Sequence, residues 1–195
     1  WILSSNIIIK TAPTLNIDDA VRNKCLGEAY FLRAHYYFIL ATFFGDVPLV
    51  TEPQDVNGDL YPTRAPKAEI YNLIVSDLEK AIQLLPTKQQ YGDSDKGRAS
   101  KGAAIGALAK VNLTLGNWQK VVDLTTQLEG MGYALNSDYS DNFNINTENS
   151  IESLFEVQYA SDGGYDFWSN ENQSSWTSTH MGPRGSNFVG GGWGW

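Results

Sequence analysis

Hydrophobic residues between Asp18 and Phe44 recur at helical spacing, in a stretch that contains no proline and only one glycine. One stripe comprises Leu26, Ala29, Tyr30, Tyr37, Leu40 and Phe44, and a second comprises Phe31, Ala34, Phe38 and Ala41. Two apolar stripes predict a long central helix that is covered by neighbours on more than one side. Gly45 is expected to close this helix in the left-handed conformation, and residues 46–48 to lead into an extended segment.

A second helix is expected to begin at Pro66, because proline suits the first helical position, and to stop before Pro86. Its single apolar stripe comprises Ile70, Ile74, Leu78, Ala81, Ile82 and Leu85. The polar stretch 87–97 contains two glycines and is typical of an exposed loop. Aspartates at calcium-like spacing occur within it, but the other ligands of an EF-hand are missing, so a solvated loop is favoured.

A third helix is predicted over about 99–115, with small residues that allow close approach of a neighbouring helix, namely Ala103, Ala104, Gly106, Ala107 and Ala109. A tight turn at Gly116, Asn117 and Trp118 then precedes a helix through Val121, Val122, Leu124 and Leu128. This arrangement resembles one tetratricopeptide repeat, which would make Trp118 a core residue. The two preceding helices are candidates for a second, irregular pair.

The character of the chain changes after Gly132, where Asn, Ser, Asp and Gly dominate. Alternation over Ser153–Tyr159 fits a short strand, and the chain from Ala160 onward is rich in Gly, Ser, Asn and Trp. The prediction is an all-α, tetratricopeptide-like repeat scaffold over residues 1–130, with at most short strands, and an irregular, loop-rich extension over 131–195. The terminal tryptophans indicate that the sequence stops within a larger protein.

Composition narrows the classes of partner. The net charge of −8 and the absence of a basic stripe argue against nucleic acid. Cys25 has no cysteine to pair with and follows charged residues in a helical pattern, so it is expected in the core and not as a lipidation site. With His35 and His180 as the only histidines, no metal or other cofactor is expected. No apolar run is long enough to cross a bilayer.

Four motifs, in order, are similar to the SusD/RagB family of outer-membrane nutrient-binding lipoproteins. They are GEAYFLRAHYYF with FGDVPLV (27–38 and 44–50), EIY through DLEKA and LP (69–86), GRASKGAA (97–104), and ESLFEVQY (152–159). The resemblance covers most of the chain, without the family's lipidated N-terminus and a long C-terminal portion. It implies a tetratricopeptide-like scaffold, a lipid anchor lying outside this chain, exposure on the outer membrane and a SusC-like TonB-dependent transporter as partner.

A saccharide site requires flat aromatic rings for the C–H faces of the sugar, flanked by amides and carboxylates for its hydroxyls. The loop-rich tail supplies this mixture, and the predicted ligand-binding residues are Tyr165, Trp168, Asn170, Trp176, Trp193 and Trp195. The alternative is that these aromatic side chains pack the loops onto the helices.

Catalysis is not expected. A glycosidase requires two carboxylates at a set distance, and no motif selects a pair among Glu156, Asp162 and Asp166. Arg33, which lies among apolar residues, is expected to pair with backbone carbonyls or with a carboxylate such as Glu28 or Asp46. The sequence thus predicts a non-enzymatic surface receptor that captures a glycan and delivers it to a transporter. The alternatives are a helix-repeat adaptor that binds protein and a peptide-binding RagB-like receptor.

Overall fold

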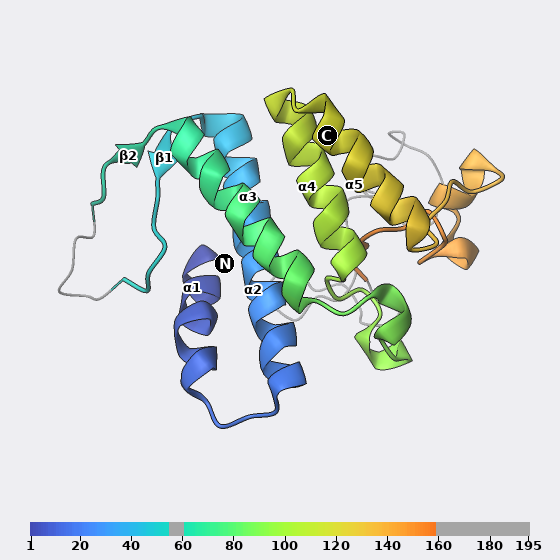
Figure 1. Ribbon diagram of the computed structural model, residues 1–195, viewed down its shortest axis with the longest axis horizontal. Helices are drawn as coiled ribbons and strands as arrows, with labels where there is room; N and C mark the ends of the chain where they lie inside the picture. Colours follow the sequence, from blue (N-terminus) through green and yellow to red (C-terminus); the bar gives the residue numbers. More distant parts are fainter. Residues whose placement is uncertain (55–60, 159–195) are drawn as a thin grey trace, which may run out of the picture. The chain divides into compact units, whose positions relative to one another are not determined.

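A computed structural model describes residues 1–54 and 61–158 of the chain. Residues Trp1–Glu156 form one compact unit, to which the helices belong. The helices in this part of the chain are α1 (Ile2–Thr11), α2 (Asp19–Phe44), α3 (Lys67–Leu84), α4 (Lys101–Leu115) and α5 (Trp118–Gly130) (Figure 1). Short 3₁₀ turns join them, η1 (Ala12–Thr14), η2 (Lys88–Gln90) and η3 (Asp93–Asp95), and η4 (Tyr139–Phe143) and η5 (Ile145–Thr147) follow.

The long predicted helix is confirmed as α2. The Asp18 carboxylate caps it by accepting hydrogen bonds from the amides of Ala20 (2.8 Å) and Val21 (3.3 Å). Gly45 ends it with φ +70° and ψ −118°, so φ is positive as predicted, but the residue is not in the left-handed helical region. Asp46 follows Gly45, and strand β1 (Val47–Pro48) begins at the next residue.

Strands β1 (Val47–Pro48) and β2 (Arg64–Ala65) form a two-stranded antiparallel ladder in which Val47 is opposite Ala65. Pro66 then precedes α3 as its N-cap, so the helix begins one residue later than predicted. The first helical amide, that of Lys67, donates to the Asp46 carboxylate at 2.8 Å. A residue directly after α2 thus caps α3, which ties the ends of the two helices together.

Helix α4 begins two residues later than predicted, because the Ser100 hydroxyl caps it by accepting from the Ala103 amide. Gly116 ends it in the left-handed conformation (φ +77°, ψ +17°), and α5 follows directly. The predicted helix–turn–helix pair is therefore present. Trp118, however, is 66% exposed, so its prediction as a core residue is wrong. It begins α5 with its side chain outward, and Leu124 and Leu128 supply the buried face.

Each helix packs chiefly against its neighbours in the sequence, so that α1, α2, α3, α4 and α5 lie in chain order (Figure 1). The core consists mainly of aliphatic and small residues from α2, α3 and α4, including Phe31, Ala34, Tyr37, Ala41, Ile70, Ile74, Leu78, Ala81, Ala104, Ile105, Leu108 and Val111. This consecutive stacking confirms the predicted all-α, tetratricopeptide-like scaffold.

Three smaller predictions need correction. No strand forms over 153–158, the part of the predicted strand that is described, because this segment attaches to α2 and α4 through side chains and not through a ladder. Cys25 is only partly buried. His35, expected within the packed helix, has an exposed side chain on α2.

Candidate functional site

The six predicted ligand-binding residues, Tyr165, Trp168, Asn170, Trp176, Trp193 and Trp195, lie outside the described residues. The same holds for Asp162, Asp166 and His180. Their assignment stays a prediction. What the structure shows is the scaffold that precedes them, which holds a buried polar network, a polar cleft and an exposed apolar ridge.

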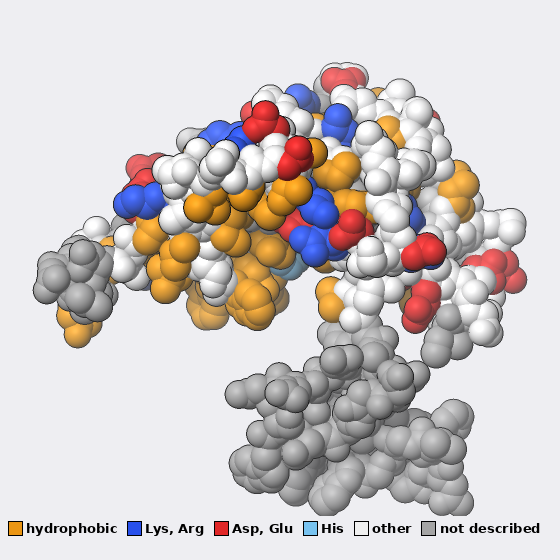
Figure 2. All heavy atoms as spheres, turned by 90° about the horizontal axis from the view of Figure 1, so that it is seen from below, with side chains coloured by type: hydrophobic (Ala, Val, Ile, Leu, Met, Phe, Trp, Pro, Cys, Tyr) orange, Lys and Arg blue, Asp and Glu red, His pale blue; other side chains and the backbone are white. Residues whose placement is uncertain are grey.

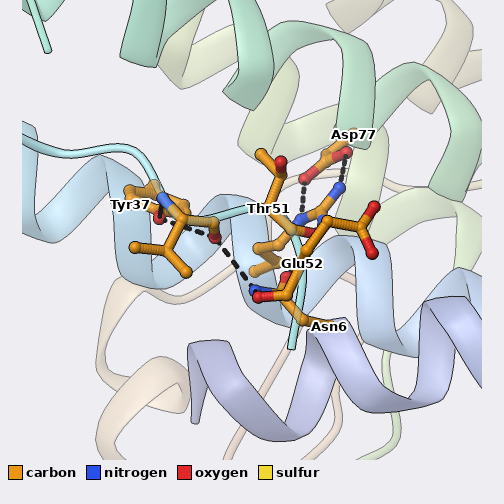
Figure 3. A network of polar contacts seen from close by, with 7 residues as sticks. Asn6, Tyr37, Thr51, Glu52 and Asp77 are labelled. Atoms are coloured by element: carbon orange, nitrogen blue, oxygen red, sulfur yellow. Dashed lines mark hydrogen bonds and ion pairs between the residues drawn. The ribbon is translucent and has the colours of Figure 1, made fainter. Parts of the chain in front are cut away.

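The buried network is centred on Arg33 of α2 and Asp77 of α3 (Figure 3). Arg33 Nε and Nη2 donate to the two carboxylate oxygens of Asp77 at 2.7 and 2.8 Å, and the two side chains are 5% and 0% exposed. This is the two-pronged geometry in which guanidinium and carboxylate bind most strongly. A carboxylate partner for Arg33 was predicted, but the suggested Glu28 and Asp46 were wrong.

The network also holds the chain segment that follows β1. Arg33 Nη1 donates to Asn6 Oδ1 (2.9 Å) and to the Thr51 carbonyl (3.2 Å), and Asn6 Nδ2 donates to the Val50 carbonyl (2.9 Å). The Tyr37 hydroxyl accepts from the Val50 amide at 2.7 Å and donates to its carbonyl at 3.0 Å. Burial raises the pKa of Tyr37, which keeps this hydroxyl protonated as a donor. Side chains from α1 and α2 thus fix residues 50–51, and Asp77 of α3 in turn holds Arg33.

A polar cleft of about 280 Å³ lies between the loop 88–100 and the segment 148–156. Aromatic rings of Tyr91 and Phe155 line it together with basic, acidic and amide side chains. Its volume lies just under the roughly 300–1,000 Å³ typical of small-molecule sites. A ligand here would have to be small and polar.

Most charged groups of the cleft already have partners. Arg98 binds the Glu28 carboxylate through Nε and Nη2 at 2.7 and 2.6 Å, and Lys24 approaches Asp95 at 3.4 Å. The Tyr91 hydroxyl donates to the Ala99 carbonyl at 2.7 Å, and burial, with the nearby Glu28 carboxylate, raises its pKa to about 12. The charged groups of the cleft therefore serve mainly to stabilise the scaffold. They do not form an open reactive site.

Hydrophobic side chains gather on one face of the helical unit (Figure 2). Phe43 and Phe44, at the end of α2, are 76% and 65% exposed, and Ile39 is also exposed. We call Ile39, Phe43 and Phe44 the α2 ridge. A groove of about 580 Å³ between α1, α2 and β1 includes Phe44, and another of about 440 Å³ between α2 and α4 includes Ile39 and Phe43. An exposed apolar surface of this kind is typical of an interface.

The α2 ridge was missed by the sequence analysis, which expected neighbours to cover the helix on more than one side. That is correct for Phe31, Ala34 and Ala41, which are buried, but not for the last turns. The continuous apolar run at the end of α2 was the available signal, and it does not distinguish a core from an interface.

The described residues show no grouping of three or more metal-ligating side chains. Glu156, one of the three carboxylates considered for hydrolysis, accepts a hydrogen bond from the Asn149 amide at 3.1 Å, so it serves its own loop. Among the described helices, none is long and apolar enough to cross a membrane.

Residues 1–113 match the family model described as SusD-like, starch-binding and associating with the outer membrane. The chain belongs to the SusD-like family. A SusD-like protein of Formosa agariphila is 30% identical over 168 residues, which are 83% of this chain and 31% of that protein. The resemblance to the SusD/RagB family is thereby confirmed.

Two solved structures, one of them of a SusD-like protein, show the same helical arrangement. A laminarin-binding SusD-like protein superposes with a TM-score of 0.86 at 29% identity, covering 94% of this chain and 42% of that one. A structure with a xylogluco-oligosaccharide superposes with a TM-score of 0.70 at 26% identity, covering 82% and 33%. This SusD-like chain spans about a third of the curated relative that it matches.

Proposed function

We propose that this SusD-like chain is part of a cell-surface receptor that captures a glycan and delivers it, unaltered, to a SusC-like TonB-dependent transporter. The observation that carries the proposal is the superposition of 94% of the chain on a laminarin-binding member of its family. That two relatives carry different glycans on one scaffold supports a role for loops, and not helices, in selecting the sugar.

The ligand surface in this proposal is the aromatic tail, with Trp168, Trp176 and Trp193 as stacking platforms. Tyr165, Asn170 and Trp195 complete the set. Large, stiff rings bury much area for little lost rotamer freedom, which suits a sugar face. The segment 148–156, which precedes the tail in the sequence, supports this proposal, because Leu154 and Phe155 attach it to the helical scaffold. Residues 131–195 are then the opening of the loop-rich region, and 1–130 its helical support.

The same proposal places the receptor on the outer membrane, held by a lipid anchor. The family description, association with the outer membrane, supports the location. The transporter is proposed as the protein partner, and no nucleic acid is expected at a net charge of −8. Catalysis has no part in the mechanism, since binding by stacking and hydrogen bonds leaves the glycan intact.

Affinity electrophoresis in laminarin, xyloglucan and starch gels tests the proposal. We expect retardation by at least one polysaccharide, reduced by Trp168→Ala, Trp176→Ala or Trp193→Ala. Trp118→Ala is the matched control, because Trp118 is an exposed tryptophan on α5, outside the proposed surface. Equal loss in the Trp118 variant, or no retardation in any glycan panel, would reject the tail as a glycan surface.

A helix-repeat receptor for protein or peptide is the second candidate, and the α2 ridge favours it. Phe43→Ser and Phe44→Ser would then abolish capture of a peptide or protein ligand. If the first proposal holds, these two variants keep full glycan retardation, and calorimetry with the same glycan gives an unchanged Kd.

A further inference from the structure

The ammonium group of Lys88, in η2, lies against the backbone turn formed by residues 149–153, far away in the sequence. Its Nζ donates to the carbonyl oxygens of Asn149 (3.0 Å), Ser150 (3.0 Å) and Ser153 (3.1 Å). An ammonium group has three protons, and here each one has a carbonyl acceptor. Burial lowers the pKa of Lys88, which shows that the contact is made at some cost in solvation.

The turn that surrounds this ammonium has an unusual backbone. Asn149 has φ +56°, the one positive φ among the described non-glycine residues. Its amide donates to Glu156, and the Ser153 amide donates to the Ser150 carbonyl at 3.2 Å. Three carbonyl oxygens therefore converge on one point. Without a positive charge there, they would repel one another and lose the hydrogen bonds that Lys88 donates.

Residues directly after the turn attach it to the helices. A Cβ atom at Gly106 of α4 would lie 2.5 Å from Leu154 Cδ1, so Leu154 fills the notch that this glycine leaves. The ring of Phe155 meets that of Phe31 of α2 edge to face, with centroids 5.3 Å apart. Lys88, Leu154 and Phe155 thus join the segment 149–155 to three separate parts of the scaffold.

We propose that Lys88 is a positioning residue, an internal cation that holds the 149–153 turn in shape and thereby supports glycan binding by the loop-rich tail. The second half of this statement rests on the proposed glycan function, and the first half does not. The site would accept a primary ammonium group and no neutral group of the same size.

Hydrogen exchange of the whole chain, measured on peptides spanning 149–156, tests the first half. Lys88→Met keeps the length of the side chain and removes its donors. We expect exchange in this segment to rise by at least about tenfold, with α4 unchanged. Lys96→Met is the control, because Lys96 lies in the same loop and pairs at the surface with Asp93. Unchanged exchange, or an equal rise throughout α4, would overturn the proposal.

Chemical rescue separates charge from packing. In Lys88→Ala, n-propylammonium should restore slow exchange at 149–156, whereas n-propanol should not. Equal rescue by the alcohol would reduce Lys88 to a filler of space and reject the internal cation.

Glycan retardation of Lys88→Met tests the second half. We expect weaker retardation than in wild type or Lys96→Met. Wild-type affinity together with faster local exchange would reject a role of Lys88 in glycan binding. Failure of the wild type to bind any glycan would reject the proposed function, while the exchange experiment would still decide the role of the ammonium.

Discussion

The side chain of Tyr133 occupies the space that a Cβ atom on Gly102 would need. A Cβ at that position in α4 would lie 2.5 Å from Tyr133 Cε2, and the tyrosine is buried. The Leu154 side chain fills the space beside Gly106 in the same way, one helical turn further along α4. The glycines of α4 therefore receive side chains of the segment after α5, which is how residues beyond the helices are held on them.

Gly102→Ala is expected to destabilise the protein. Overpacking of a filled site costs about 1–3 kcal/mol, and the better helix propensity of alanine offsets only about 0.5–1 kcal/mol. Urea unfolding should therefore give a net loss of about 1–2 kcal/mol in the free energy of unfolding. Gly130→Ala is the control, because nothing lies within 4 Å of its added Cβ, and this variant should be neutral or more stable. Equal stability of the two variants would contradict the packing argument.

The helices themselves could be predicted because their ends carry local signals. Asp18, Pro86 and Gly116 each act within a few residues, and the apolar stripes of α2, α3 and α4 have the helical period. The start of α4 shifted by two residues, where the adjacent Ser100 supplies the cap. The start of α3 shifted by one, where the Asp46 carboxylate caps the helix from 21 positions away.

The features that could not be predicted depend on contacts between residues that lie far apart in the sequence. Arg33 and Asp77 are separated by 44 positions. Sequence spacing did not favour Asp77 over Glu28 or Asp46 as the partner of Arg33. The repeat pattern suggested a buried Trp118, but here α5 has no helix of the described chain following it, and the indole stays exposed. The predicted ligand residues in the tail remain a prediction, since they lie outside the described residues.

Breaking the Arg33–Asp77 pair should be costly. Arg33→Met leaves the Asp77 carboxylate fully buried without its partner, for which about 3–5 kcal/mol of lost stability is expected. It also frees the Thr51 carbonyl, so limited proteolysis near residues 50–52 should become faster. The double variant Arg33→Met with Asp77→Leu removes both charges and should recover part of the loss. A double variant no more stable than Arg33→Met would show that the buried charge is not the cause.

The α2 ridge should contribute little to folding. Phe43→Ser and Phe44→Ser change exposed side chains. The free energy of unfolding, measured by thermal denaturation, should therefore change by no more than about 0.5 kcal/mol in either direction. Ile74→Ala, in the fully buried face of α3, should cost about 2–5 kcal/mol in the same assay. A loss of comparable size in the phenylalanine variants would mean that the ridge is part of the core.

Order in the segment 134–152 should depend on pH through Glu152. Its carboxylate accepts hydrogen bonds from the Asn136 amide (2.9 Å) and from Asn142 Nδ2 (3.1 Å), and these bonds, the amide first, hold the pKa of Glu152 below its ordinary value of 4.5. A carboxyl group whose pKa is lower in the folded state stabilises that state above pH 4.5. Its contribution is lost as the pH falls through the lowered value.

The Asn136 amide reports this loss locally, so its NMR shift and exchange rate should change in acid with a midpoint below that of an ordinary glutamate. In Glu152→Gln the change should be absent, because the amide oxygen still accepts the bond but does not titrate. Asp138 is a second carboxyl group of this segment whose pKa is lowered, here by the Ser140 amide, and Asp138→Asn is therefore the control. If the Asn136 response persists in Glu152→Gln and disappears in Asp138→Asn, the segment is held by the aspartate and not by Glu152.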